Sequence, residues 1–436
     1  MKRRSFCFGK RTRARICLRQ AAALLAVCSI TFSVILGGCT TSVGSAALPL
    51  SESIVELTKG MSRAGQVMAL SDEENTACAE AAAEFAIRFM RNCAKDGESS
   101  VVSPVSLLCA LGMVVNGAEG DTLKQAEDVL GMDRQTYNAF LGAYTDYLRR
   151  ASFTKVSLAN SVWFADKMEV KESFLRDNVA IYDAEAFQAP MNELTTDAVN
   201  EWARTNTFDM IPKIYEELPE AVMLLVNATA LQAKWILPFE KSGLKMPFTM
   251  RDGKEKRVEM MNNTENYFIS DQYAQGIIKE YYDGFAFAAI LPEEGMTVGQ
   301  YLNQIDGEQL TRMLSEYSAE PVEVTMPEFT AETTLDLRTA LEELEFDFLL
   351  RPDVDLSGMT DEKLIYVSGG RQKTHIAVSP EGTEAAAASA ITMTAAAAYI
   401  PSDNSARRIV FDRPFLYVIY NRSNMVPIFI GACEEP

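Results

Sequence analysis

The hydrophobic pattern after residue 71 first predicts helices. Ser71-Asp72-Glu73-Glu74 has the form of a capping box, in which the first side chain and the glutamate three positions later satisfy each other's backbone N–H groups. Small and aromatic residues then recur at helical spacing, at Ala77, Ala81, Phe85 and Phe89. A more buried helix is predicted within Val101–Asn116, beginning at Ser103-Pro104. A third helix is predicted over Thr333–Leu344.

Other apolar runs have the length and residue types of strands. Four of them are Val156–Phe164, Val222–Trp235, Phe285–Leu291 and Pro321–Phe329, the last with clean alternation. Near the end of the chain, Phe415–Tyr420 and Val426–Ile430 predict a hairpin of two strands that are buried on both faces. Because helices and strands are mixed without strict alternation, the pattern favours a single large α+β domain.

The N-terminus has the pattern of an export signal. Residues 1–38 hold eight basic residues and no acidic one, and Gln20–Leu36 is an apolar run. Leu36-Gly37-Gly38-Cys39 resembles the bacterial lipoprotein box, which implies a cleaved signal and a lipid on Cys39. We expect residues 39–75 to form a flexible tether and the protein to be exported and lipid-anchored to the cell membrane, facing outside the cytoplasm. An uncleaved membrane anchor is the alternative.

Charge and composition exclude several classes of protein. The net charge is −19, and the basic signal leaves −27 on the rest, which argues against nucleic-acid binding. His375 is the single histidine, so no pair of histidines could bind zinc and any catalytic triad would need this one residue. Asp353–Gly358 begins like a calcium loop, but Leu364 occupies the position of the required bidentate glutamate. We therefore predict no metal and no cofactor.

Residues 380–401 are unusual in composition. They read Pro-Glu-Gly-Thr-Glu-Ala-Ala-Ala-Ala-Ser and continue to Pro401 with small or apolar residues. A helix and a low-complexity linker are two interpretations. The third is an extended strand with every second residue on one face, at Thr383, Ala385, Ala387, Ser389, Ile391, Met393 and Ala395. That face carries no charge, and Glu384 lies on the other, so the segment could enter a sheet.

The same segment resembles the hinge of the serpin family. The matching hinge residues are Glu381, Gly382, Thr383, Glu384, Ala385, Ala386, Ala387, Ala388 and Ser389. Further motifs follow in the family's order, among them Ser103-Pro104-Val105-Ser106, Asn200-Glu201-Trp202, Asn227-Ala228, Trp235, Met326-Pro327 and Arg413-Pro414-Phe415. The resemblance implies mixed central sheets, surrounding helices and an exposed reactive loop over about 380–401, in a domain spanning 76–436.

The resemblance also implies a function, which is that of an inhibitor and not an enzyme. A serine or cysteine endopeptidase would cleave the loop and be trapped as an acyl-enzyme while the loop inserts into the central sheet. The family spacing places the scissile bond at Ala396–Ala397, with Met393 and Tyr399 as alternatives. Alanine at the bond would suit an elastase-like or subtilisin-like target, and we expect a monomer.

The resemblance assigns a sheet-opening region and shows departures from the family. The region comprises Ser103, Ser106, Asn227, Trp235 and Gln372, the last standing where many members have histidine. Pro380 replaces a usual glutamate, and proline has no N–H for a ladder bond. Pro380 therefore supports a second hypothesis, a non-inhibitory surface protein with the serpin fold. An unrelated lipoprotein enzyme or receptor is the third.

Overall fold

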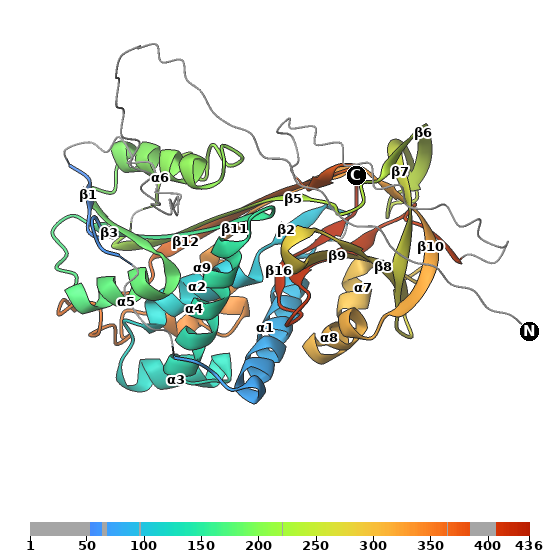
Figure 1. Ribbon diagram of the computed structural model, residues 1–436. Helices are drawn as coiled ribbons and strands as arrows, with labels where there is room; N and C mark the ends of the chain where they lie inside the picture. The colour runs from blue at the N-terminus through green and yellow to red at the C-terminus, as the bar shows by residue number, and fades with distance from the viewer. Residues whose placement is uncertain (1–52, 63–67, 96, 220, 364, 384–406) are drawn as a thin grey trace, which may run out of the picture. The chain divides into compact units, whose positions relative to one another are not determined.

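The computed structural model describes residues 53–62, 68–95, 97–219, 221–363, 365–383 and 407–436 (Figure 1). The predicted signal and Cys39 lie outside the described residues. So do the hinge positions after Thr383, the predicted bond Ala396–Ala397, and its alternatives at Met393 and Tyr399.

A seven-stranded mixed sheet has the order β1-β4-β3-β5-β13-β12-β11. Neighbouring strands are antiparallel except for two parallel pairs, β3 with β4 and β5 with β12. The strands are β1 (Val55–Glu56), β3 (Lys155–Ala165), β4 (Glu185–Ala189), β5 (Met223–Lys234), β11 (Phe329–Asp336), β12 (Gly369–Ser379) and β13 (Gly382–Thr383). The pair β5–β12 joins segments far apart in the sequence at the middle of this sheet.

A nine-stranded sheet has the order β14-β10-β7-β8-β9-β15-β16-β2, with β6 paired to β7. Its strands are β2 (Ser100–Val102), β6 (Glu240–Thr249), β7 (Glu255–Ser270), β8 (Ala274–Glu280), β9 (Phe285–Pro292), β10 (Ser318–Pro327), β14 (Arg407–Val410), β15 (Phe415–Asn421) and β16 (Pro427–Cys433). The predicted C-terminal hairpin is confirmed, because β15 and β16 pair antiparallel and every residue of both is buried.

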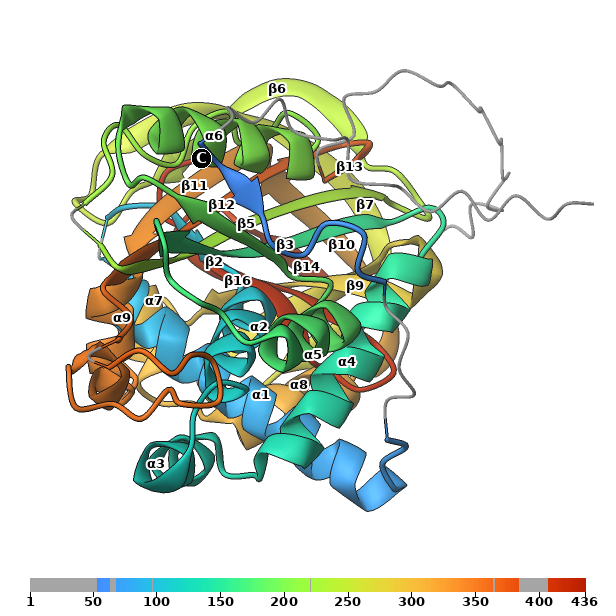
Figure 2. The same ribbon diagram turned by 90° about the vertical axis from the view of Figure 1, so that its left-hand side faces the viewer.

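Helices cover the sheets on several sides (Figures 1 and 2). They are α1 (Asp72–Cys93), α2 (Pro104–Val115), α3 (Gly120–Leu130), α4 (Arg134–Arg150), α5 (Glu172–Tyr182), α6 (Glu193–Asn206), α7 (Val298–Leu302), α8 (Gly307–Ser315) and α9 (Leu337–Glu343). On one face of the seven-stranded sheet, Val199 and Trp202 of α6 pack with Leu224 and Val226 of β5. The wholly buried α2 belongs to the larger core cluster on the other face. The described residues form a single large α+β domain, as predicted.

The two helix starts predicted from capping signals are confirmed. The Ser71 hydroxyl accepts from the Glu74 N–H at 3.2 Å, and the Glu74 carboxylate accepts from the Ser71 N–H at 2.7 Å. The second helix begins at Pro104, with Ser103 as its N-cap, while the preceding Val101 and Val102 belong to β2.

Two boundaries differ from the sequence prediction. The predicted helix over Thr333–Leu344 is wrong in its first part, because the β-branched residues Thr333 and Thr334 pair with β12 in β11. The helix begins only at Leu337, where the Asp336 carboxylate caps the backbone. Within the predicted tether, Val55–Glu56 pairs with β4 and Ile54 is buried, so this short segment belongs to the folded sheet.

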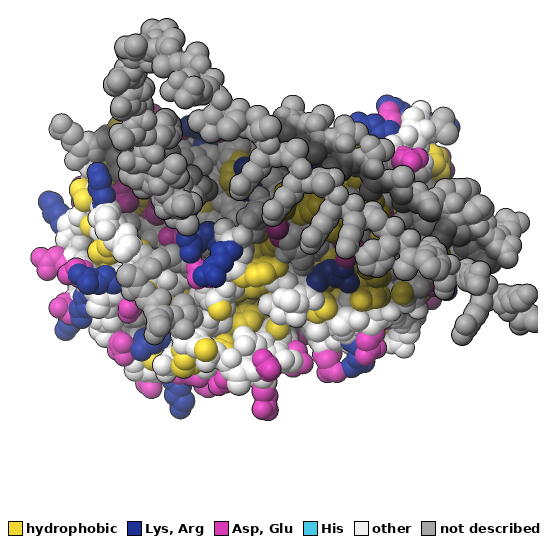
Figure 3. Space-filling view, in the orientation of Figure 1, with side chains coloured by type: hydrophobic (Ala, Val, Ile, Leu, Met, Phe, Trp, Pro, Cys, Tyr) yellow, Lys and Arg dark blue, Asp and Glu magenta, His cyan; other side chains and the backbone are white. Residues whose placement is uncertain are grey.

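Charged side chains of both signs are interspersed on the face shown in Figure 3. Many form exposed ion pairs, such as Arg149 and Arg150 with Asp146 on α4. Among the described residues no helix is long and apolar enough to cross a bilayer. The four described cysteines, Cys78, Cys93, Cys109 and Cys433, form no disulfide with one another, and three of them are buried.

Candidate functional site

The described part of the hinge forms a third strand between β5 and β12. After β12 ends at Ser379, residues 380–381 make a two-residue turn, and β13 runs back antiparallel to β12 with Thr383 opposite Val378. On its other side β13 is antiparallel to β5, with Gly382 opposite Lys234 and Thr383 opposite Ala233. The hinge therefore enters the central sheet at the end where β5 and β12 separate.

Gly382 is required by a close approach between backbones. A Cβ atom at this position would lie 2.1 Å from the carbonyl oxygen of Ala233 and 3.0 Å from the Cα of Lys234. Real Cβ atoms do not approach backbone so closely, and the φ angle of 156° also suits glycine better than other residues. The glycine lets the hinge pass beside β5.

Pro380 occupies the turn and not the ladder. Its ring precedes β13, so no ladder bond is lost where the N–H is missing, and proline is well suited to the second position of a β-turn. Its carbonyl oxygen accepts from the Phe239 N–H at 2.8 Å, and the next carbonyl, of Glu381, accepts from Trp235 N–H at 3.3 Å. The structure thus removes the backbone argument against hinge insertion.

Thr383 packs on an aromatic platform. Its side chain is fully buried, and its hydroxyl is hydrogen-bonded to the hydroxyl of Tyr281. The Tyr281 ring stacks on Trp235 with centroids 4.1 Å apart, and the Trp235 indole N–H donates to the Ser379 carbonyl at 2.9 Å. Burial raises the pKa of Tyr281 well above its ordinary value, so the phenol stays neutral. The first inward-facing position of the hinge is therefore already seated.

Below β13, β5 and β12 pair directly. The parallel register runs from Leu224 opposite Gly369 to Thr229 opposite Thr374. We call these six pairs the seam. Between the seam and β13 lie three residues of each strand, Ala230–Gln232 on β5 and His375–Ala377 on β12. Any further strand between β5 and β12 must first fill this interval and then separate the seam.

Polar side chains of the predicted sheet-opening region line the seam on the side of α2. Gln372 makes two hydrogen bonds with the backbone of Ser103, donating to its carbonyl at 3.2 Å and accepting from its N–H at 3.3 Å. The Ser103 hydroxyl donates to the Ile428 carbonyl at 2.8 Å. Asn227, opposite Gln372 in the seam, donates its amide to the side chain of Asn160. Ser106 lies in the first turn of α2, whose N-cap is Ser103, and it is also fully buried.

Part of the hydrogen-bonding capacity of this seam is unused. Among the described residues, four buried oxygens around it have no partner, namely Ser106 Oγ, Asn227 Oδ1, Thr229 Oγ1 and Thr374 Oγ1. A buried polar group without a partner costs about 1–3 kcal/mol. The closed seam is therefore less stable than an apolar strand pair of the same length would be.

The family model that matches residues 80–436 is described as "Serpin (serine protease inhibitor)". This chain belongs to the serpin family. Serpin I2 of Homo sapiens is 26% identical over 373 residues, which cover 81% of this chain and 90% of that protein. Alpha-1-antiproteinase of Ovis aries is 26% identical over 394 residues, 84% of this chain and 92% of its own.

Solved structures agree with the family assignment. The native state of the thermophilic serpin Tengpin superimposes with a TM-score of 0.80 at 30% identity, covering 88% of this chain and all of that one. Thyroxine-binding globulin in complex with thyroxine has a TM-score of 0.73 at 21% identity, covering 83% of this chain and 99% of its own, and shows the fold alone. The family is described as one of serine protease inhibitors and not of catalytic enzymes, so the prediction that this chain is not an enzyme is confirmed.

The serpin site contains a buried ion pair that sequence reasoning missed. Lys279 of β8 and Glu265 of β7 are both buried, with 2.5 Å between Nζ and Oε1. The ammonium lies 4.0 Å from the ring centroid of Phe239 and 5.4 Å from that of Trp235. Burial lowers the pKa of Lys279 and raises that of Glu265, and each charge partly offsets the shift of the other. No local sequence pattern pairs two residues on different strands.

His375 makes a cross-strand contact on the surface of the seven-stranded sheet. It lies on β12 opposite Glu332 of β11, with its Nδ1 3.4 Å from that carboxylate. The Glu332 carboxylate is also 2.9 Å from Lys373. This cross-strand contact agrees with the interpretation of His375 as a structural residue.

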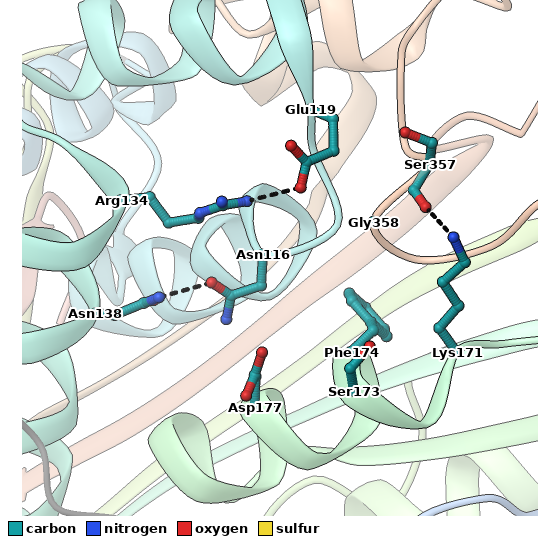
Figure 4. A pocket seen from close by; sticks show the side chains of 10 residues that line it. All are labelled: Asn116, Glu119, Arg134, Asn138, Lys171, Ser173, Phe174, Asp177, Ser357 and Gly358. Carbon is teal, nitrogen blue, oxygen red and sulfur yellow. Dashed lines mark hydrogen bonds and ion pairs between the residues drawn. The ribbon is translucent and has the colours of Figure 1, made fainter.

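A polar pocket of about 490 Å³ lies away from the hinge, where α4, α5 and the segment around Ser357 meet the end of α2 (Figure 4). It is lined by Asn116, Glu119, Arg134, Asn138, Lys171, Ser173, Phe174, Asp177, Ser357 and Gly358. Both cationic side chains of this pocket already form ion pairs, Arg134 with Glu119 at 3.6 Å and Lys171 with Asp361 at 2.6 Å. The segment considered as a calcium loop packs here, with the Gly358 N–H donating to the Gly117 carbonyl at 3.0 Å.

Proposed function

We propose that this serpin inhibits an endopeptidase as a suicide substrate. The target, a serine or cysteine endopeptidase, cleaves the loop over about 380–401 and is held as an acyl-enzyme while the loop inserts between β5 and β12. The observation that carries the proposal is β13, which already pairs with both strands in the antiparallel register that an inserted loop needs. Strand addition to a sheet is one of the general modes of peptide recognition, for which serpin loops are a known example.

The register of β13 defines the proposed inserted strand. Continuing from Thr383, the positions Glu384–Ala386 would fill the interval between β13 and the seam, opposite Gln232–Ala230 of β5. In the same register Thr392 would reach Leu224 and Gly369, the last pair of the seam. Insertion would replace one parallel strand contact by two antiparallel ones. With about ten new ladder bonds at roughly 1 kcal/mol each, the gain is on the order of 10 kcal/mol.

The composition of the loop supports insertion. In this register the positions on the face of Thr383 are Ala385, Ala387, Ser389 and Ile391, none of which is charged. Thr383 itself is buried in the platform, which is the environment expected for this face. The charged Glu384 would face the other side, toward α6.

The scissile bond and the target class rest on the sequence. We propose Ala396–Ala397 as the bond, with Met393 and Tyr399 as alternatives. An alanine before the bond would select a protease with a small apolar specificity pocket, elastase-like or subtilisin-like. If the scissile bond instead followed Met393 or Tyr399, it would select a protease with a deeper specificity pocket.

The location of the protein also rests on the sequence. We propose that residues 1–38 are removed, that Cys39 carries lipid, and that the serpin domain acts outside the cytoplasm as a membrane-tethered monomer. A Cys39→Ala variant should lose lipid and leave the detergent phase in phase partitioning. A cleaved variant that stays in the detergent phase would contradict the lipid assignment.

The test of the inhibitory function uses the full chain and a panel of serine and cysteine proteases. We expect a complex with at least one protease that survives boiling in denaturant, and a cut whose position mass spectrometry assigns. Cleavage of the loop by every active protease with no stable complex would contradict inhibition and favour the non-inhibitory surface protein. The panel should include elastase and subtilisin, and a catalytically inactive protease variant as the control.

A further inference from the structure

A second pocket, of about 290 Å³, lies at the lower end of the seam. It brings together the segment between α6 and β5, the first turn of α9 and the start of β12. Tyr215 contributes from the first of these elements, Arg338 from the second, and Gly369, Gly370 and Arg371 from the third. The pocket is thus built from both sides of the seam.

The two arginines of this pocket have no acidic partner. Arg371 stacks its guanidinium on the Tyr215 ring, 4.5 Å from the centroid, and donates to the Ile214 carbonyl at 3.0 Å. Arg338 donates to the Ser368 carbonyl at 2.8 Å. Within the described residues neither forms an ion pair, although the chain carries a net charge of −19. Both cations of the larger pocket in Figure 4 are paired, so the difference is a property of this site.

A third donor in the pocket, the Tyr215 hydroxyl, is unused. Tyr215 is 2% exposed, and its hydroxyl has no hydrogen-bond partner among the described residues. Burial raises the pKa of Tyr215 above its ordinary value, so the phenol keeps its proton and can donate it. A buried hydroxyl without a partner is costly, and a bound acceptor would remove that cost.

Two acidic residues, Asp336 and Glu217, also line the pocket, and both are exposed. Asp336 lies opposite Arg371 in the β11–β12 register, and its charge adds to the rise that burial causes in the pKa of Tyr215. Asp336 caps α9, where its carboxylate accepts from the Arg338 N–H at 2.8 Å, and Glu217 is exposed. Neither approaches a guanidinium closely enough to form an ion pair. The pocket therefore presents two guanidinium groups and a phenol, which are all donors, beside two exposed carboxylates.

We propose that this pocket binds a small oxyanion, a phosphate or a carboxylate, between Arg338, Arg371 and Tyr215. The planar fork of arginine matches such oxyanions and can hold them through two parallel hydrogen bonds. The pocket volume fits a small anion better than a drug-sized ligand.

The bound anion would also act on the sheet. Tyr215 packs with Leu224 and Val226 on the β5 side of the seam, whereas Arg371 belongs to β12. A ligand held by both binds the closed seam better than the open one, and it therefore slows loop insertion. This second statement rests on the proposed inhibitory function, but the existence of the site does not.

Calorimetric titration of the full chain tests the site itself. Inorganic phosphate forms one arm and acetate the other, with sodium chloride at equal ionic strength as the blank. We expect saturable binding of at least one ion at one site per chain. The affinity should fall at least tenfold in Arg371→Gln and in Arg338→Gln, and should not change in Arg149→Gln, whose side chain is paired on the exposed face of α4.

Tyr215→Phe tests the third donor with the smallest change to the fold. It removes only a hydroxyl that has no partner in the structure, and it should weaken binding several-fold while the melting temperature of the anion-free protein stays the same or rises. Absence of saturable binding for both ions would overturn the site. So would undiminished affinity in Arg371→Gln.

The rate at which the cleaved chain gains thermal stability tests the coupling. Saturating anion should slow this gain at least threefold in the parent and not in Arg371→Gln. An equal rate with and without bound anion would overturn the coupling. If the anion-free cleaved chain gains no stability at all, the proposed insertion fails while the calorimetric result for the site stands.

Discussion

Two largely buried strand pairs of this serpin differ in the side chains that line them. The hairpin β15–β16 joins strands separated by a short turn, and its side chains are mostly apolar and aromatic. The seam β5–β12 joins strands more than a hundred residues apart and is lined on its α2 side by Asn227, Thr229, Gln372 and Thr374. The hairpin is suited to stay closed.

Under the proposed mechanism, one domain combines a strand pair that stays closed with a strand pair that opens. Separating apolar strands exposes hydrocarbon to water, whereas separating the seam frees Thr229 and Thr374, whose hydroxyls are unsatisfied while it is closed. The seam is also bordered by β13, so a new strand can grow from one end without first opening the whole sheet.

Cleavage within residues 396–399 should raise the melting temperature by about 10–20 °C, because the inserted strand adds on the order of 10 kcal/mol. Scanning calorimetry of the intact and the cleaved chain measures this. As a control, a protease site engineered into the exposed turn at Asp252-Gly253, between β6 and β7, should give no increase when cut. An unchanged or lower melting temperature after loop cleavage would contradict insertion.

Thr383→Arg should abolish the stable protease complex. The arginine would be forced against Tyr281 and Trp235, and burying an unpaired charge costs several kcal/mol. The variant should be cleaved at the same bond and release active protease, which gel analysis and residual activity measure. Glu384→Arg, one position further on the face predicted to be exposed, should retain most of the trapping. Equal trapping by both variants would show that insertion is not the mechanism.

Lys279→Met should destabilise the intact chain by about 3–5 kcal/mol, because Glu265 is left buried without its partner. Denaturant unfolding measures the change. Burial raises the pKa of Glu265, and the loss of Lys279 should raise it further, so the unpaired carboxylate destabilises above that pKa. The deficit should therefore shrink as the pH falls from 8 to 5.

The matched control for this change is the double variant Lys279→Met with Glu265→Gln. It should recover most of the lost stability and lose the pH dependence of the deficit. If the single variant showed the same deficit at pH 8 and pH 5, the charge on Glu265 would not be its cause.

Thr374→Val should stabilise the closed seam by about 1 kcal/mol and slow insertion after cleavage, since it removes a buried hydroxyl without a partner. The opposite change in the hairpin, Val418→Thr, should destabilise by about 1–3 kcal/mol, because it introduces such a hydroxyl. Equilibrium unfolding of both variants measures the pair. Similar effects of the same sign would contradict the contrast between the two strand pairs.

The family and part of the secondary structure could be predicted from the sequence, whereas helices α3 to α8 of the described residues were not. Local signals were sufficient for the Ser71 cap, the start of α2 at Ser103-Pro104 and the C-terminal hairpin, because each depends on residues close together in the chain. The alternation that begins at Thr383 predicts the hinge on the same kind of local evidence. The helix predicted over Thr333–Leu344 failed at Thr333–Asp336, where pairing with β12 outweighed local preference.

How the hinge meets the sheet depends on tertiary contacts. From the sequence, Pro380 predicts a lost ladder bond, but the fold places it in the turn before Gly382, which passes beside Ala233. The contacts of Thr383 with Tyr281 and of Lys279 with Glu265 join different strands, so no spacing in the sequence announces them. The family and the start of β13 at Gly382–Thr383 follow from local patterns in the sequence, which also predict the rest of the hinge and its uncharged face. The seated threonine, the unsatisfied seam and the pocket of unpaired arginines required the fold, because each brings together side chains that only chain packing makes neighbours.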